Sequence, residues 1–297
     1  GKTFRVSRQI LFLADPGDSP GPAGDGSVSA RQEETSRDTT LYRVSADHFR
    51  YSTEGDERVA VLEGNVRIDH QSATITSRRG VQYPDKRFTV LEDDVHAVDG
   101  TLEMKSDIGE YYRDEALLIA RGNVRVTDRG WRIVCDRARY DRVRRVAVLT
   151  GSLKLSDSTR VMYADSIIYN RRTGIADAIG NVVLIDEVEQ YSISGRHARY
   201  DKAAGRAVVD IDPILMFDLD AKERGTIAAE WMEFDVENKI GIAVDNVRLV
   251  KGETRAECDS AAIYDEEGLV RLFGEPVATN KTSGMTGDRM EIYYTDD

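Results

Sequence analysis

The chain has 297 residues, enough for one or two domains with a sizeable core, and 40% hydrophobic with 32% charged residues is an ordinary soluble composition. Its formal net charge of -12 argues against a nucleic-acid-binding surface, because neutralising phosphates requires clustered Lys and Arg. The two cysteines, Cys135 and Cys258, occupy matching places in separate repeats. We predict that they are too far apart for a disulfide and serve as small buried apolar residues.

The N-terminal stretch, residues 1–40, is rich in Pro, Gly, Ser and charged residues and is predicted to be a flexible linker. A short strand within Phe4–Leu13 is the alternative for its first apolar piece. Because residue 1 is not Met, we expect a mature form, a processed product or a fragment. Any segment that tethers the protein to a membrane would then lie outside this chain.

A motif, Gly122-Asn123-Val124-Arg125-Val126, recurs at intervals of about 29 residues. Related copies begin at Gly64, Asp93, Gly151, Gly180, Asp212, Asp245 and Gly274. A period of this length is typical of stacked repeat architectures. In two copies Asp93-Asp94 and Asp212-Pro213 replace Gly-Asn, so a glycine-dependent bend must be made differently there.

Each repeat has two halves and is predicted to be a hairpin of two long strands. The first half ends in an aromatic residue, as at Tyr83, Tyr112, Tyr140, Tyr169 and Tyr200, and a polar turn follows. The second half alternates strictly: Val124 and Val126 fall on one face, and Asn123 and Arg125 on the other. Strands this long rarely stay straight, and the mid-strand Gly marks a bend. We therefore predict an all-β, elongated structure of two antiparallel sheets with apolar faces inward, built from about eight hairpin repeats.

Chemical motifs are not apparent. The histidines, His48, His70, His96 and His197, lack metal-ligand spacing, and no phosphate loop or nucleophile motif occurs. One acid recurs per repeat, at Asp47, Asp136, Asp165, Asp259 and Asp288, whereas calcium requires six or more oxygen ligands. We predict that these acids stabilise the bends or face water, and that the protein has no metal, no cofactor and no enzymatic activity.

The repeat unit resembles the OstA-like repeat of the lipopolysaccharide-transport periplasmic proteins of the LptA type. The unit is Ala-Asp-x-x-x-Tyr, a turn, an apolar alternation and then Gly-Asn-Val, and its best copies are Ala164–Asp186, Cys135–Asp157 and Ser106–Asp128. The resemblance covers residues 41–297, which it implies to be one β-jellyroll (β-taco) domain. A minor break near residue 187, where a turn lengthens, is the alternative.

What the resemblance implies is a periplasmic bridge that passes lipopolysaccharide from the inner to the outer membrane of Gram-negative bacteria, with its acyl chains in an apolar interior. Exposed edge strands would associate with other jellyroll proteins of the transport system, anchored in the inner membrane or located in the outer membrane, or with a second copy. The residues then expected to line the lipid-binding interior are Val66, Ile68, Leu118, Val124, Val126, Leu149, Leu153, Leu155, Val182, Leu184, Val247 and Leu249. The same alternation builds any closed sandwich, so a structural scaffold with a filled core is the alternative.

Overall fold

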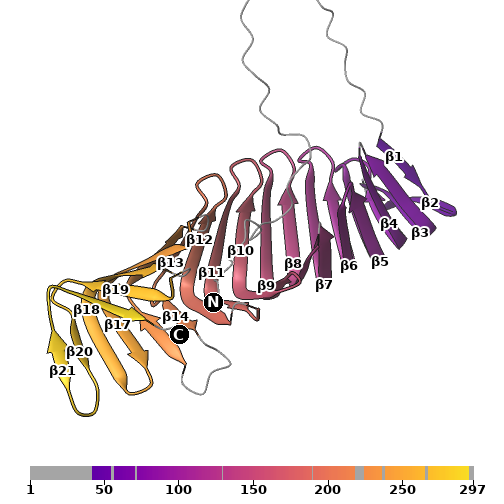
Figure 1. Ribbon diagram of the computed structural model, residues 1–297. Coiled ribbons are helices and arrows are strands. Elements are labelled where there is room, and N and C mark those ends of the chain that lie inside the picture. Colours follow the sequence, from indigo (N-terminus) through magenta and orange to yellow (C-terminus); the bar gives the residue numbers. More distant parts are fainter. Residues whose placement is uncertain are drawn as a thin grey trace, which may run out of the picture.

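The computed structural model describes residues 42–54, 57–70, 72–128, 130–188, 190–217, 224–235, 238–264 and 267–293, and the predicted linker lies outside this range. All regular elements of this part are strands (Figure 1). The first twelve are β1 (Tyr42–Ser45), β2 (His48–Glu54), β3 (Glu57–His70), β4 (Ala73–Tyr83), β5 (Phe88–Asp99), β6 (Leu102–Tyr112), β7 (Leu117–Asp128), β8 (Trp131–Asp141), β9 (Val146–Ser156), β10 (Arg160–Asn170), β11 (Ile175–Asp186) and β12 (Tyr191–Asp201). The others are β13 (Arg206–Asp210), β14 (Ile214–Phe217), β15 (Gly225–Ala228), β16 (Trp231–Asp235), β17 (Ile240–Lys251), β18 (Thr254–Tyr264), β19 (Leu269–Phe273), β20 (Val277–Thr279), β21 (Gly284–Thr286) and β22 (Arg289–Tyr293).

The alternating pattern forms strands with one buried face, as predicted. In β7, Val124 and Val126 are buried, whereas Asn123 and Arg125 are exposed. Consecutive long strands from β3 to β12 pair antiparallel with their sequence neighbours, which gives the row of stacked hairpins seen in Figure 1. The elongated all-β antiparallel architecture is therefore confirmed.

The layers are the two halves of one continuous, 22-stranded sheet, rather than two separate sheets. Long strands bend without breaking: β7 pairs with β8 at Arg121↔Arg137 and again at Val124↔Cys135, so Gly122 and Asn123 form a bulge. Two consecutive residues with positive φ mark each bend; they are Gly64 and Asn65, Asp93 and Asp94, Gly122 and Asn123, Gly151 and Ser152, Gly180 and Asn181, Ile211 and Asp212, Asp245 and Asn246, and Gly274 and Glu275. The bend expected at Asp212-Pro213 thus lies one residue earlier, at Ile211-Asp212.

The recurrent acid of each repeat lies directly against a bend. Asp107 lies so close to Gly122 that a Cβ at this glycine would overlap its carboxylate, and the Asn123 Nδ2 donates to Asp107 Oδ2 over 2.8 Å. The same arrangement joins Asp47 to Asn65 and Asp165 to Asn181. The prediction of a bend-stabilising acid is confirmed for these copies.

Where an aspartate replaces the asparagine of the bend, an arginine replaces the acid that faces it. Arg78 forms an ion pair with Asp94, and Arg196 Nε lies 3.9 Å from Asp212 Oδ2. The two departures from Gly-Asn therefore keep a polar link between neighbouring strands through charges of opposite sign.

The bends divide the folded sheet into two facing walls. The first wall ends at the turns 84–87, 113–116, 142–145, 171–174 and 202–205, and the second wall ends at the opposite turns, such as 100–101 and 157–159. Apolar side chains from both walls fill the space between them, which we call the interior. Leu62, Ala120 and Leu155, for example, belong to one buried cluster within it.

The interior contains two apolar clusters, one from Leu62 to Tyr200 and one from Tyr191 to Ala278 among their buried members. Leu184 and Ala198 pack against or within both clusters. The hydrogen-bonded pairing of β11 with β12 continues on both sides of the turn near residue 187. A domain boundary at this turn remains a prediction.

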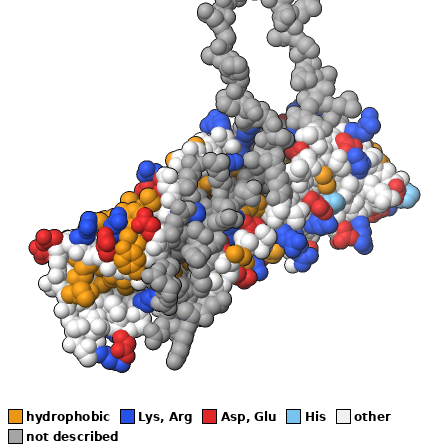
Figure 2. Space-filling model, viewed as in Figure 1, with side chains coloured by type: hydrophobic (Ala, Val, Ile, Leu, Met, Phe, Trp, Pro, Cys, Tyr) orange, Lys and Arg blue, Asp and Glu red, His pale blue; other side chains and the backbone are white. Residues whose placement is uncertain are grey.

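The outer surface carries charges of both signs over the N-terminal strands, whereas hydrophobic side chains gather over the C-terminal strands (Figure 2). Exposed ion pairs such as Arg67 with Asp69 and Arg79 with Glu92 connect this surface. Among the described residues there is no helix of sufficient length and apolarity to cross a membrane.

Candidate functional site

The residues predicted to line the interior all lie on its inward face. Val66, Ile68, Val124, Val126, Leu149, Leu153, Leu155, Val182, Val247 and Leu249 are buried, and Leu118 and Leu184 are half-buried against the same clusters. Much of the interior is filled, since several of these residues, including Val124 and Leu155, are no more than 1% exposed. Space remains in two cavities, which these residues border in part.

The larger cavity, of about 710 Å³, lies where the tips of the two walls face each other near the N-terminal end. The second wall contributes the turn around Gly100, and the first wall contributes the turn around Val143. Its apolar lining comes from Ile68, Ile75, Ala97, Leu102 and Leu118. We call this cavity the mouth, because it lies between the two tips and carries polar side chains at its rim.

Side chains from the two walls meet across the mouth. His70 Nδ1 of the second wall forms a hydrogen bond with the Tyr111 hydroxyl of the first wall. Arg142 Nη1, which also belongs to the first wall, lies 3.5 Å from the same nitrogen. Burial, followed by the positive charges of Arg142 and Arg113, lowers the pKa of His70, so the neutral imidazole is favoured as an acceptor here.

A row of arginines follows the first wall's rim. Arg113, Arg142 and Arg171 each open a turn, and their backbone N–H groups donate to Arg87, Ala116 and Arg145 in the preceding turns over 3.0, 3.1 and 2.8 Å respectively. These bonds fix successive turns to one another. Arg142, Arg145 and Arg171 line the mouth, and Arg171 Nη1 donates to the Tyr140 hydroxyl over 3.0 Å.

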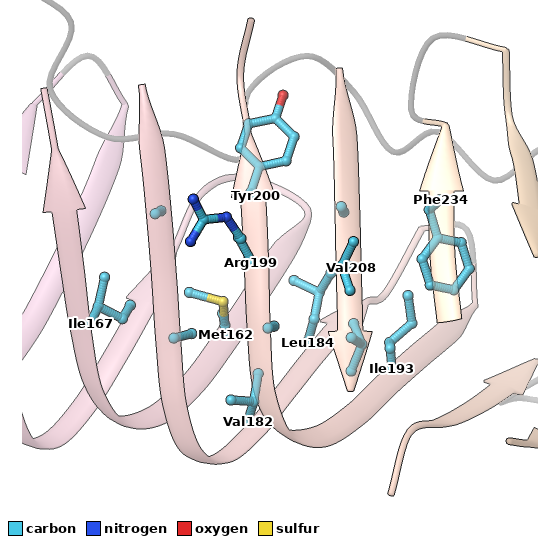
Figure 3. A pocket seen from close by; sticks show the side chains of 14 residues that line it. Met162, Ile167, Val182, Leu184, Ile193, Arg199, Tyr200, Val208 and Phe234 are labelled. Atoms are coloured by element: carbon cyan, nitrogen blue, oxygen red, sulfur yellow. The ribbon is translucent and has the colours of Figure 1, made fainter. Parts of the chain in front are cut away.

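The smaller cavity, of about 70 Å³, lies where the two apolar clusters meet. Figure 3 shows Met162, Leu184 and Ile193 around this space, with Tyr200 at its upper end and Phe234 at its side. Val182 and Leu184 are the predicted residues that border it. The lining is almost entirely apolar, so this cavity suits a hydrocarbon rather than a polar ligand.

A comparison with protein families identifies this region. Residues 38–184 match the sequence profile of the OstA-like proteins. Over these residues the chain is a member of the OstA-like family. Among solved structures, the chain is similar to LptH of Pseudomonas aeruginosa, described as the LptA-homologous periplasmic component of the conserved lipopolysaccharide transport device. That match has 11% identity, covers 48% of this chain and 82% of the other, and has a TM-score of 0.27. None of the curated proteins matches the chain.

Analysis of the sequence missed the arginine row of this OstA-like chain. The signal was present, because Arg113, Arg142 and Arg171 recur at the same 29-residue spacing as the Gly-Asn motif. The in-register aromatic of the second repeat copy was also wrong: Tyr111, rather than Tyr112, is buried and faces the interior with Tyr140. Two adjacent tyrosines gave no means of choosing between them from the pattern alone.

The remaining candidates show no grouping for catalysis or metal binding in the described part of the chain. Three or more His, Cys, Asp or Glu side chains nowhere converge there on a site for a metal ion. His96 Nε2 lies 3.0 Å from Glu103 Oε1, and His197 Nδ1 lies 2.8 Å from Asp210 Oδ1. These are pairwise contacts on the surface of the sheet, remote from each other in the repeats.

Proposed function

We propose that this OstA-like protein is a periplasmic lipopolysaccharide-binding bridge, whose interior receives acyl chains entering through the mouth. The observation that supports this most is an apolar cavity, of about 710 Å³, placed at the meeting point of the two wall tips. Each buried methylene contributes about 0.8 kcal/mol, so several acyl carbons suffice to hold a lipid without covalent chemistry. Transport by this route needs no catalytic residue.

Passage along the interior would require local separation of the walls. The mouth and the smaller cavity are joined by closely packed side chains, among them Val126, Leu149 and Leu153. An acyl chain moving between the cavities would replace contacts between these side chains with contacts to hydrocarbon, so the apolar environment is maintained. The proposal therefore places bound lipid in the two cavities and makes the packed stretch the barrier between them.

The partners we propose are other jellyroll proteins of a transport system, or a second copy of this chain, joined through the ends of the sheet. At the N-terminal end, β1 and β2 both pair with β3. At the C-terminal end, β22 pairs with β19 and β21 pairs with β20. Strands that terminate a sheet offer backbone donors and acceptors to another chain, which favours end-to-end association.

Site-specific photo-crosslinking tests lipid binding directly. A photoreactive phenylalanine analogue at Leu118, in the mouth, or at Leu184, in the smaller cavity, should form adducts with purified lipopolysaccharide. The same analogue at the exposed positions Arg125 and Lys154 is the matched control and should give none. Adducts at neither inward position, in protein that melts like the unmodified chain, would refute the proposal.

The alternative is a scaffold with a closed core, and the filled stretch of the interior favours it. Leu155 and Val247 are each 1% exposed, as expected for a core that only packs against itself. This reading predicts no co-purified lipid in native mass spectrometry and no change in melting temperature when lipopolysaccharide is added. A lipid that binds the folded chain must instead raise its melting temperature.

A further inference from the structure

The arginine row at the mouth lies beside the apolar floor, in a chain whose net charge is -12. Arg142, Arg145 and Arg171 line the cavity, and among its described lining residues Asp99 is the single carboxylate. Asp99 accepts a hydrogen bond from Ser72 Oγ over 2.6 Å on the opposite rim. The local charge of the mouth is therefore opposite in sign to the charge of the whole protein.

Neighbouring acids of the same turns are engaged by arginines outside the lining. Arg87 Nη1 lies 2.8 Å from Asp114 Oδ1, and Arg144 Nη1 lies 3.7 Å from Asp141 Oδ2. These pairs are on the outer side of the turns, where Arg144 is 77% exposed. The arrangement separates outward arginines, which pair with acids, from the arginines that border the cavity.

The spacing of the row suits a tetrahedral anion. Successive arginines of the row are two strands apart, or about 9.6 Å along the sheet, so two long side chains can converge on one group between them. Guanidinium forks match phosphate oxygens in a bidentate way, and several of them are suited to a group that carries more than one negative charge. The Tyr111 and Tyr140 hydroxyls lie beside the same rim and can supply further hydrogen bonds.

We propose that the mouth is a headgroup site for a phosphate-bearing amphiphile, in which Arg142 and Arg171 hold the phosphate while the acyl chain lies over Ile68, Leu102 and Leu118. This inference rests on the proposed lipid-binding interior and adds the chemistry that selects the cargo. The phosphate orients the lipid with its headgroup at the rim, because burying it among apolar side chains would carry a large desolvation cost. Lipids of equal chain length are thus distinguished by their headgroup charge.

Two lipids that differ only in the phosphate test the site: 1-lauroyl lysophosphatidic acid and 1-monolauroylglycerol, below their critical micelle concentrations. Titration calorimetry at low salt should show about tenfold tighter binding of the phosphate form, which corresponds to about 1.4 kcal/mol. In Arg142→Gln/Arg171→Gln this advantage should fall below about threefold, while the affinity for monolauroylglycerol is unchanged. Arg144→Gln, in the same turn but directed outward, is the matched control and should keep the full advantage.

A second variant separates charge and fork geometry from a structural role. Arg142→Lys/Arg171→Lys keeps both charges and should restore part of the phosphate preference. Equal affinity for the two lipids in the wild type overturns the headgroup site, and so does an equal loss for both lipids in the glutamine variant. Inorganic phosphate that displaces the lysophosphatidic acid at similar concentration would show a free-anion site and overturn the amphiphile. Failure of both lipids to bind the wild type would also remove the proposed function.

Discussion

At the scale of single residues, the bend is the most demanding position in the repeat. Gly122 has φ +73° and faces the Asp107 carboxylate, so it combines a left-handed backbone with a close approach. The following residue, Asn123, also has positive φ, at 48°, and its side chain bonds to the same carboxylate. Asparagine tolerates this conformation better than most residues with a Cβ, which explains why Gly-Asn recurs.

The first prediction concerns this glycine. Gly122→Ala should lower the free energy of unfolding by about 2 kcal/mol, because the alanine Cβ is strained at positive φ and overlaps Asp107. Gly130→Ala is the control, since Gly130 has φ +90° but no neighbour within 4 Å. Urea unfolding measures both. An equal loss for the two variants would show that contact with Asp107 contributes nothing.

The two cysteines have a structural explanation at the same scale. Cys135 Sγ lies 3.5 Å from the Arg137 carbonyl oxygen, and Cys258 Sγ lies 3.2 Å from that of Ser260. Ser77 donates in the same way to Arg79. The position thus takes a small side chain that donates to the carbonyl two residues further on, beside the bend. Both thiols are free in the structure, as predicted.

The second prediction follows from the burial of Cys135. Burial raises the pKa of this thiol from 9.0 to about 11, so at pH 9 roughly 1% is thiolate in the folded protein, against about half in the unfolded chain. Alkylation by iodoacetamide at pH 9 should be at least tenfold slower in the folded protein than in urea, and it should accelerate as the pH rises towards 11. Use of Cys258→Ser isolates the single thiol. Equal rates would contradict the burial.

At the scale of elements, polar pairs across the bends connect each strand to the one before it. Most described bends place an acid opposite an amide, as Asp165 lies opposite Asn181, and Glu230 similarly contacts Asn246. The bend of β5 reverses this chemistry, with Arg78 of β4 facing Asp94. The reversal indicates that complementarity between neighbouring strands matters more than the identity of either residue.

The third prediction tests this complementarity. Arg78→Asp should destabilise the protein by about 0.5–1 kcal/mol, because it sets two carboxylates against each other at an exposed site. Adding Asp94→Asn should recover most of the loss by recreating the acid–amide pair found at Asp107 and Asn123. Thermal unfolding of both single variants and the double variant gives the coupling. Additive effects would show that the two side chains act independently.

At the scale of the whole molecule, the sheet ends in strands with exposed apolar side chains. On β2, Phe49 and Tyr51 are 43% and 72% exposed, and their rings stack at 6.5 Å. They lie at the N-terminal end of the stack, where we propose that another jellyroll associates. An apolar pair on a terminal strand favours association there, because it combines available backbone groups with surface that water solvates poorly.

The fourth prediction is that charges on this strand block association. Phe49→Lys/Tyr51→Lys should shift end-to-end assemblies to monomers in analytical ultracentrifugation while the far-ultraviolet circular dichroism spectrum stays unchanged. Val188→Lys, which is equally exposed but lies in a turn along the body, is the control and should leave assembly intact. Assemblies that persist in the β2 variant would place the contact elsewhere.

The sequence alone determined the strands, the bends and the side of the sheet that faces inward. Alternation placed Val124 and Val126 inside, and the Gly-Asn pairs marked the bulges, because both are local properties with a period that can be counted. Even the departures at Asp93-Asp94 were located correctly. The exception was Ile211-Asp212, where a proline and a longer period displaced the expected register by one residue.

Only the tertiary structure decided where space remains between the walls and what borders it. His70 and Tyr111 are 41 residues apart and meet only because two separate bends bring the wall tips together. Alternation states that a side chain points inward, but the separation of the walls depends on how side chains from distant repeats pack. The mouth, with its apolar floor and its row of arginines, was therefore visible only once the sheet had folded onto itself.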